Sequence, residues 1–254
     1  EAAEVEAAPA GIHAALDQVI ESPIARGRVI SPDQMDRHGL MMAGMNQDHP
    51  IFTESIRRIR ELLGDTGLQA LEQDVLERLV HSSGDPSIAE LLRFSPGACE
   101  VGLAALRAGA VILTDTEMAA AAVTPMARRT LRSTVRTVLE WAPDQAPKES
   151  TRTAEGIQRA WSSLNENVSV PAPVVLIGSA PTALERLLNT VAAGARPASL
   201  IIGMPVGFVG VLASKARLAE SEQCHIRLEG TRGGAGLVAA AANALLRAAV
   251  TAQA

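Results

Sequence analysis

The sequence has 254 residues, a formal net charge of −5 and 2% aromatic side chains, with three Phe, two Trp and no Tyr. A negative charge disfavours a nucleic-acid partner, and the few aromatic rings nearly exclude stacking of bases. No apolar run reaches the length of a membrane span and no secretory signal is visible, so we expect a cytoplasmic protein without a membrane partner. We expect Cys99 and Cys224 to be buried small hydrophobes in a reducing compartment, because two cysteines make neither a disulfide framework nor a zinc site.

Residues 1–48 differ in pattern from the rest and are predicted to form a partly helical N-terminal extension. The apolar residues within 12–20 have the spacing of one short amphipathic helix. Ser31 and Pro32 have the character of a helix start, with Ser as the N-cap and Pro in the first turn. The main domain is therefore predicted to span 49–254.

Three helices are predicted ahead of the first strand. Residues 51–63 and 68–82 carry apolar side chains at helical spacing, and Gly64 and Gly84 are suited to end these helices as C-caps. The third helix is expected within 95–109, where a Ser-Pro pair opens it and a glycine closes it.

From residue 110 onward, short and nearly all-apolar runs alternate with helical stretches. Such runs are typical of parallel strands buried on both faces. Five of these units predict a three-layer α/β/α fold, a doubly wound sheet of about five parallel strands, with extra N-terminal helices. The expected strands are 110–115, 133–141, 173–178, 198–203 and 224–230, and the expected helices among and after them are 116–122, 151–166, 181–193, 208–220 and 235–250.

Ligands of open parallel sheets bind beyond the carboxyl ends of the strands. Those ends carry Thr114-Asp115, Gly178-Ser179, the glycine-rich "GMPVGFVG" at 203–210 and "GTRGG" at 230–234. The glycines would let the backbone approach a ligand and expose amide N–H groups to it. A nucleotide is disfavoured, because no G-x-G-x-x-G follows the first strand and no Walker A sequence is present. The lack of a G-x-S-x-G elbow makes Ser179 a poor nucleophile.

The sequence has five histidines, and no pair has a metal-ligand spacing such as H-E-x-x-H, so no metal site is predicted. His225 lies within a strand, where a hydrogen-bonded structural role is expected. His81 ends a predicted helix, whose partial negative charge favours the imidazolium by about 0.3–1 kcal/mol, enough for proton donation near neutral pH. By position alone, a surface histidine that caps the helix is the stronger interpretation. Arg78 on the same helix face, together with Arg152 and Arg232, could hold several carboxylates.

A set of segments shares its order and spacing with one family: "RLVHSSGD" followed by "FSP", "AGAVILTDTEM", "STRTA", "IGSAPTAL", "IIGMPVGFVGVLASK" and "TRGGAGLVAAAANAL". On these residues the chain resembles the precorrin-8X methylmutases, the precorrin isomerases of cobalamin biosynthesis. The resemblance covers roughly residues 50–250, and "GMPVGFVG…SK" is its most specific part.

The resemblance implies a flavodoxin-like α/β/α domain, a homodimer with the active site near the subunit interface, and no cofactor. The implied reaction moves a methyl group of the corrin ring from C-11 to C-12. It converts precorrin-8X to hydrogenobyrinic acid, or cobalt-precorrin-8 to cobyrinic acid. His81 stands in the family's V-H-x-x-G motif, so it is implied as the general acid that protonates a ring nitrogen. The alternative function is a non-catalytic corrinoid-binding or carrier protein that uses the same pocket.

The substrate bears many acetate and propionate groups, so strand-end amides and arginines are expected to bind it. Ser179 stands where the family usually has Asn. Lys215 is interpreted equally well as a solvated helix residue and as a functional one. The expected substrate-binding residues are Ser55, Arg78, Thr114, Asp115, Thr116, Arg152, Thr153, Ser179, Gly203, Pro205, Gly207, Arg232 and Gly233.

Overall fold

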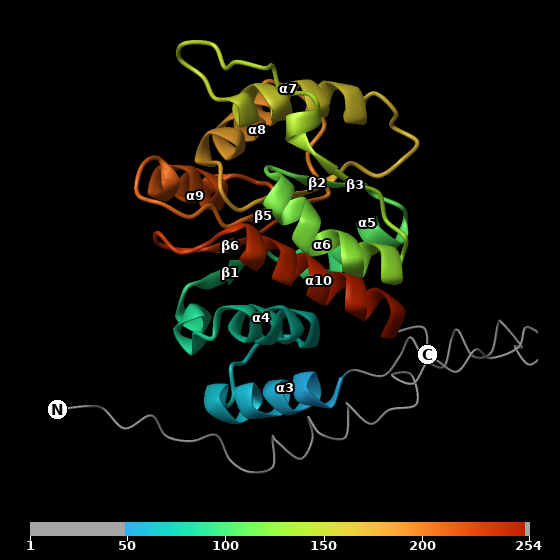
Figure 1. Cartoon of the computed structure of the whole chain (residues 1–254), viewed down its shortest axis with the longest axis vertical. Helices are drawn as coiled ribbons and strands as arrows, with labels where there is room; N and C mark the ends of the chain where they lie inside the picture. The colour runs from blue at the N-terminus through green and yellow to red at the C-terminus, as the bar shows by residue number, and fades with distance from the viewer. Residues whose placement is uncertain (1–48, 252–254) are drawn as a thin grey trace, which may run out of the picture. The chain divides into compact units, whose positions relative to one another are not determined.

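The computed structural model describes residues 49–251, which contain one six-stranded sheet and its covering helices (Figure 1). The predicted N-terminal extension, with its helix over 12–20 and its helix start at Ser31, lies outside the described residues. The boundary between 48 and 49 therefore stays a prediction. Within the described range, no helix combines the length and the apolar character needed to cross a membrane.

The elements are, in chain order, α3 (Pro50–Leu63), α4 (Ala70–Ser83), η3 (Pro86–Glu90), β1 (Leu92–Phe94), α5 (Ala98–Arg107), β2 (Ile112–Thr114), α6 (Glu117–Arg129), β3 (Val135–Thr137), η4 (Val138–Glu140), α7 (Arg152–Asn165), β4 (Val174–Ile177), α8 (Pro181–Ala192), β5 (Leu200–Gly203), α9 (Val211–Glu220), β6 (His225–Leu228) and α10 (Ala235–Thr251).

The sheet has the strand order β1-β6-β5-β4-β2-β3. Strands β2 to β6 pair in parallel, which confirms the predicted doubly wound parallel sheet. β1 is an additional edge strand that runs antiparallel to β6, with Leu92 opposite Leu228 and Phe94 opposite Ile226. The sequence pattern misses β1, because a run of three residues is too short to show a period of two.

Side chains of the central strands alternate between two apolar cores. Val174 and Leu176 of β4 pack into the core formed with α4, α5, α6 and α10, whereas Val175 and Ile177 pack into the core formed with α7, α8 and α9. All four side chains are fully buried, as expected for a parallel sheet covered on both faces. Figure 1 shows the resulting layers, with α7 and α8 on one side of the sheet and α4 and α10 on the other.

Two predicted elements differ most in length from those observed. The strand expected over 133–141 is limited to β3, because the Thr137 hydroxyl caps the 3-10 turn η4. Glu140 of that turn in return accepts the backbone N–H of Thr137 at 2.9 Å. The helix expected over 116–122 continues to Arg129 as α6, with Pro125 inside it.

Helix α3 packs on α4 as an outer element (Figure 1). Ile59 of α3 reaches the core, and the Arg60 guanidinium donates to both oxygens of the buried Glu77 carboxylate, at 2.7 and 3.0 Å. A bidentate pair of this kind fixes orientation as well as distance. The ion pair therefore helps to fix the orientation of α3 relative to α4.

The cysteines and His225 have the structural roles expected of them, with one difference. Cys99 is buried, and burial raises the pKa of its thiol to about 12. Cys224 is unpaired too but only half-buried. His225 is buried in β6, and its Nδ1 lies 2.8 Å from the carbonyl oxygen of Gln223, which confirms a hydrogen-bonded structural histidine.

Candidate functional site

The side chains of Ser55 and His81 meet at the surface where α3 packs on α4. Ser55 Oγ lies 2.8 Å from His81 Nδ1. The Phe52 ring, one turn before Ser55, stands edge-on to the imidazole with ring centroids 5.1 Å apart. His81 lies in the last turn of α4, which ends at Gly84 in the left-handed conformation with φ 67°. Because Ser55 Oγ contacts Nδ1, Nε2 is the other ring nitrogen through which the exposed His81 could bind a ligand.

The prediction that the helix end raises the pKa of His81 is wrong. Partial burial, and then the nearby Arg78 guanidinium, lower the pKa of His81 from its ordinary 6.5. Two carbonyl groups near the end of α4 accept from Ser83 Oγ, that of Leu79 at 2.9 Å and that of Val80 at 3.3 Å. In the free protein the surroundings of His81 therefore favour the neutral imidazole.

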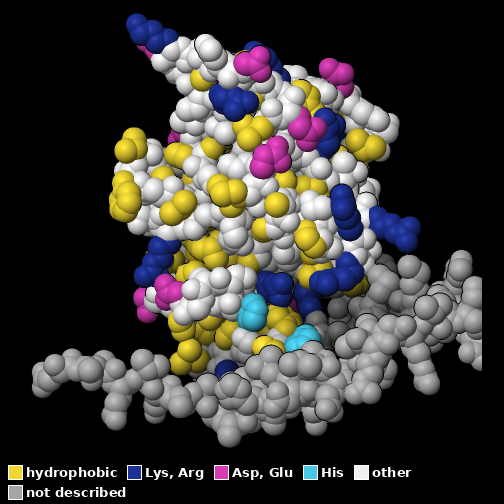
Figure 2. All heavy atoms as spheres, in the orientation of Figure 1, with side chains coloured by type: hydrophobic (Ala, Val, Ile, Leu, Met, Phe, Trp, Pro, Cys, Tyr) yellow, Lys and Arg dark blue, Asp and Glu magenta, His cyan; other side chains and the backbone are white. Residues whose placement is uncertain are grey.

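Two arginines from different helices contact the Phe52 ring. The guanidinium of Arg78 in α4 and that of Arg247 in α10 each lie 4.8 Å from its centroid, a distance at which a cation and a ring attract each other. Figure 2 shows histidine and Lys or Arg side chains gathered over α4 and α10. Sequence reasoning missed Arg247, whose only signal is a cation within an Ala- and Leu-rich helix. The cluster gives the surface around His81 a positive charge suited to carboxylates.

The carboxylate of Asp115 is directed into the protein. Its Oδ2 accepts the backbone N–H groups of Gly178 at 3.0 Å, Ser179 at 2.6 Å and Ala180 at 2.9 Å. Burial raises the pKa of this carboxyl, although the hydrogen bonds act in the opposite direction. Thr114 is fully buried as well. The structure therefore does not support direct substrate contact by Thr114 or Asp115, and Asp115 instead holds the turn that begins α8.

Two predicted residues beyond the carboxyl ends of β2 and β4 remain accessible. Thr116 is the N-cap of α6, where its Oγ1 accepts the Ala119 N–H at 3.4 Å, and it is partly exposed. Ser179 is also partly exposed, although its backbone N–H is bonded to Asp115. The Thr116 hydroxyl also donates to Asp115 Oδ1 at 3.3 Å, so the Ser179 hydroxyl is the more available of the two to a ligand.

The glycines at the end of β5 and in the loops after β5 and β6 are needed for close packing. A Cβ on Gly203 would lie 2.5 Å from a leucine side chain of α9, and a Cβ on Gly233 would lie 1.9 Å from Met204 O. Gly207 has φ 136° and donates its N–H to the loop after β6 at 3.2 Å. Gly203 and Pro205 are buried, whereas Gly207 and Gly233 are partly exposed. Gly203 and Pro205 thus lie beneath the surface that a ligand would contact.

Arg232 and Lys215 bind the loop after β6 to its surroundings from two sides. The Arg232 guanidinium donates to Asp85 Oδ2 and to Ser87 Oγ, both at 2.6 Å, just beyond the end of α4. Lys215 is buried, and its Nζ donates to Gly230 O at 2.8 Å and to Arg232 O at 2.6 Å. The interpretation of Lys215 as a solvated helix residue is therefore wrong.

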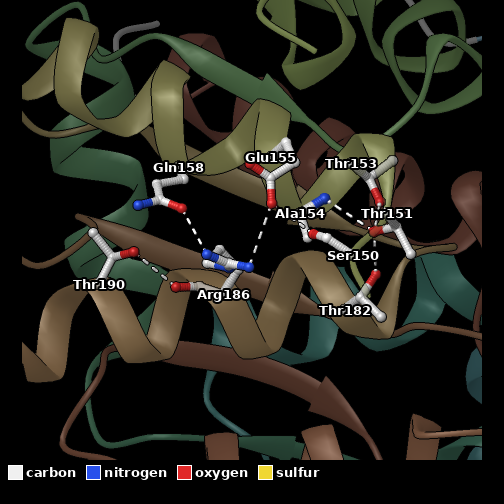
Figure 3. Close-up of polar contacts among 9 residues, drawn as sticks. All are labelled: Ser150, Thr151, Thr153, Ala154, Glu155, Gln158, Thr182, Arg186 and Thr190. Atoms are coloured by element: carbon white, nitrogen blue, oxygen red, sulfur yellow. Dashed lines mark hydrogen bonds and ion pairs between the residues drawn. The ribbon is translucent and has the colours of Figure 1, made fainter. Parts of the chain in front are cut away.

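Arg152 and Thr153 begin α7, in the layer opposite α4. Arg152 is exposed and donates to Pro143 O at 2.9 Å. Figure 3 shows the hydroxyl groups of Thr151, Thr153 and Thr182 together, with Thr151 Oγ1 3.1 Å from that of Thr153 and 2.7 Å from that of Thr182. A groove of about 440 Å³ lies beside them, between residues 148–151 and side chains of α7 and α8. Within one chain, the structure therefore separates this group from the His81 cluster.

Metal-ligating side chains are not clustered in the described part of the chain. Across residues 49–251, no group of three or more His, Cys, Asp or Glu side chains could hold a metal ion.

The chain is similar to proteins of one family along most of its length. A family model described as CbiC, precorrin-8X methylmutase, matches residues 50–248. The chain is 33% identical over 213 residues to the cobalt-precorrin-8 methylmutase of Synechocystis sp., with 78% of this chain and 95% of the relative covered. It is 38% identical over 199 residues to the precorrin-8X methylmutase of Pseudomonas aeruginosa, with 77% and 93% covered. A crystal structure of the precorrin-8X methylmutase of Thermus thermophilus matches with a TM-score of 0.71 at 37% identity, over 81% of this chain and 100% of that one.

The fold and these matches together define an isomerase of corrin biosynthesis. The chain belongs to the precorrin-8X methylmutase family, which confirms the resemblance found in its motifs. The assignment of individual site residues stays a prediction.

Proposed function

We propose that this protein moves a methyl group from C-11 to C-12 of precorrin-8X, or of its cobalt form, with His81 as the general acid. The observation that carries the proposal is the 2.8 Å contact between Ser55 Oγ and His81 Nδ1. This contact restrains the imidazole at Nδ1, and in the proposal Nε2 is the nitrogen that meets the substrate. His81 donates a proton from Nε2 to a nitrogen of the corrin ring, which makes the macrocycle electron-poor. The methyl group then migrates within the ring, and the ring nitrogen returns the proton to His81. The product has the same atoms as the substrate.

The pKa of His81 is lowered in the free protein, and in the proposal binding of the substrate raises it again. Arg78 is one of the two groups that lower the pKa in the free protein. A substrate carboxylate bound to Arg78 offsets that cation and favours the imidazolium. His81 then becomes an effective acid mainly when the substrate is bound, which limits proton donation to the complex.

The accessible predicted residues are proposed to bind the peripheral carboxylates of the macrocycle. Arg78 and Arg232 lie on the same side of the molecule as His81, since Arg232 reaches Asp85 just after α4. Gly207, Gly233, Thr116 and Ser179 are proposed to line the same edge of the sheet. Thr114, Asp115, Gly203 and Pro205 support this surface from beneath.

We also propose a homodimer in which Arg152 and Thr153 of one subunit complete the site of the other. Support comes from an exposed apolar patch on the loop after β5 and the start of α9, formed by Val206, Phe208, Val209 and Leu212. Phe208 is 92% and Val209 88% exposed, and Figure 2 shows hydrophobic side chains projecting at the left edge over α9. Apolar side chains grouped in this way typically mark a protein–protein contact. A cytoplasmic location stays a prediction that cell fractionation can check.

The function is tested by visible absorption spectra of the protein mixed with precorrin-8X, and separately with cobalt-precorrin-8, followed over time. Wild type, His81→Ala and Ser55→Ala are compared with His49→Ala, a control histidine at the exposed start of α3. Conversion by wild type and by His49→Ala, but not by His81→Ala, supports the proposal. Binding of both substrates without conversion by any variant overturns it and indicates a corrinoid carrier.

A further inference from the structure

Lys215 is a buried cation that the proposed reaction does not use. It lies in α9 and is 4% exposed. Burial lowers its pKa to about 8, and across residues 49–251 no carboxylate is near enough to act in the opposite direction. Burying a cation without a counter-ion costs free energy. The two carbonyl groups that accept from Nζ, those of Gly230 and Arg232, are therefore the contacts that stabilise it.

Both carbonyl groups belong to the loop between β6 and α10. Two backbone hydrogen bonds also join this loop to the loop after β5. Gly234 N–H donates to Met204 O at 2.9 Å, and Thr231 O accepts from Gly207 N–H at 3.2 Å. Lys215 contacts this loop from inside the protein. The Arg232 side chain leaves the same loop on the outside, where it reaches the segment that follows α4. The Lys215 ammonium thus binds this short stretch of backbone from the inside, and the Arg232 guanidinium extends from it on the outside.

We propose that Lys215 is a positioning residue, which fixes the backbone of Arg232 so that the guanidinium is presented to a carboxylate of the substrate. The inference rests on the proposed function, in which Arg232 binds such a carboxylate. Charge-assisted hydrogen bonds are stronger than neutral ones. A loop that they order before binding loses less conformational freedom when the substrate arrives. Lys215 therefore contributes to affinity without touching the substrate.

The test compares kcat and KM for the methyl shift in wild type, Lys215→Met, Arg232→Ala and the double variant. Methionine keeps the apolar stem and removes the ammonium. Lys215→Met is expected to raise KM about tenfold with kcat changed less than about twofold, because the affected contact is remote from the migrating methyl. In the Arg232→Ala background the same substitution is expected to change KM by less than about twofold, since its effect passes through Arg232. Lys215→Arg, which keeps a cationic donor, is expected to recover most of the affinity.

Ser214→Ala is the matched control, because Ser214 is buried beside Lys215 in α9 but its hydroxyl donates to Val211 O within the helix, at 3.0 Å. Its KM is expected to equal that of wild type. An unchanged KM in folded Lys215→Met overturns the inference, and so does an equal rise in KM with and without Arg232. If Lys215→Met does not fold, Lys215→Gln, an uncharged donor, decides in the same way. Absence of any conversion by wild type overturns the proposed function and this inference with it, whereas conversion with an unchanged KM overturns the inference alone.

Discussion

Asp115 Oδ2 accepts the backbone N–H of Ser179 at 2.6 Å, so a carboxylate at the end of β2 occupies the amides that begin α8. The N-terminus of a helix is a favourable place for an anion. In this protein the anion is part of the chain, and the position is not open to a carboxylate of the substrate. The contact joins β2 to the turn after β4, two neighbouring strands of the sheet.

Substitution of Asp115 is expected to affect stability more than affinity. Asp115→Ala should lower the free energy of unfolding by about 3 kcal/mol, because three inward-facing N–H groups lose their acceptor. Asp115→Asn keeps one oxygen in place and should cost about 1 kcal/mol. Urea unfolding followed by circular dichroism measures both values. An equal loss for the two variants would show that the Oδ2 acceptor is not what holds this turn.

The pH dependence of kcat/KM should report the pKa of His81 in the free enzyme. A general acid must be protonated, so kcat/KM is expected to fall as the pH rises through that pKa, which partial burial and Arg78 hold below 6.5. Arg78→Gln removes a neighbouring cation, so the midpoint should move to higher pH. Arg57→Gln, on the exposed face of α3, is the control with an unchanged midpoint. A midpoint that stays or moves to lower pH in Arg78→Gln is the contrary result.

A charge in the apolar patch should separate the proposed dimer. Val209→Asp places a carboxylate on a side chain that is 88% exposed, so it should leave the fold of the single chain unchanged while it opposes burial in an interface. Sedimentation velocity is expected to show a dimer for wild type and a monomer for Val209→Asp, with conversion lost because the two groups of site residues no longer meet. Val168→Asp, at a position 75% exposed elsewhere, should remain a dimer. Dimers in both variants would place the interface elsewhere.

Replacement by alanine of Gly230 and of Gly233, in the loop that carries Arg232, should lower the stability by different amounts. A Cβ at Gly233 would lie 1.9 Å from Met204 O, whereas a Cβ at Gly230 would meet nothing within 4 Å. Gly230 has φ 70°, so Gly230→Ala should cost about 1 kcal/mol from backbone strain alone. Gly233→Ala should cost more than about 3 kcal/mol, because two loops must move apart. Thermal unfolding of the two variants measures the difference, and comparable melting temperatures would contradict the close approach of the loops.

Most of the fold could be predicted from the sequence because β4 and β5 are uninterrupted apolar runs. The segments among the strands have lengths that suit helices, and α8 between β4 and β5 begins at a proline. β1 could not be predicted, since its three residues become a strand only by pairing with β6. Motifs placed His81 and Ser55 correctly on two helices, but the pKa of His81 depends on burial and on Arg78 in three dimensions. Asp115 and Lys215 both lie inside the protein. Their partners are distant in sequence, so no local pattern could show that Asp115 faces inward or decide between the two interpretations of Lys215.

The occupied amides at the strand ends have a consequence for how this site can diverge. The backbone at this end of the sheet is held by Asp115, by Lys215 and by the contact between the loops after β5 and β6, whereas the side chains of Thr116 and Ser179 are partly exposed above it. Side chains can be exchanged one at a time without rebuilding the scaffold. A related protein that accepts a differently decorated macrocycle can therefore arise by a few surface substitutions, with the folding core left as it is.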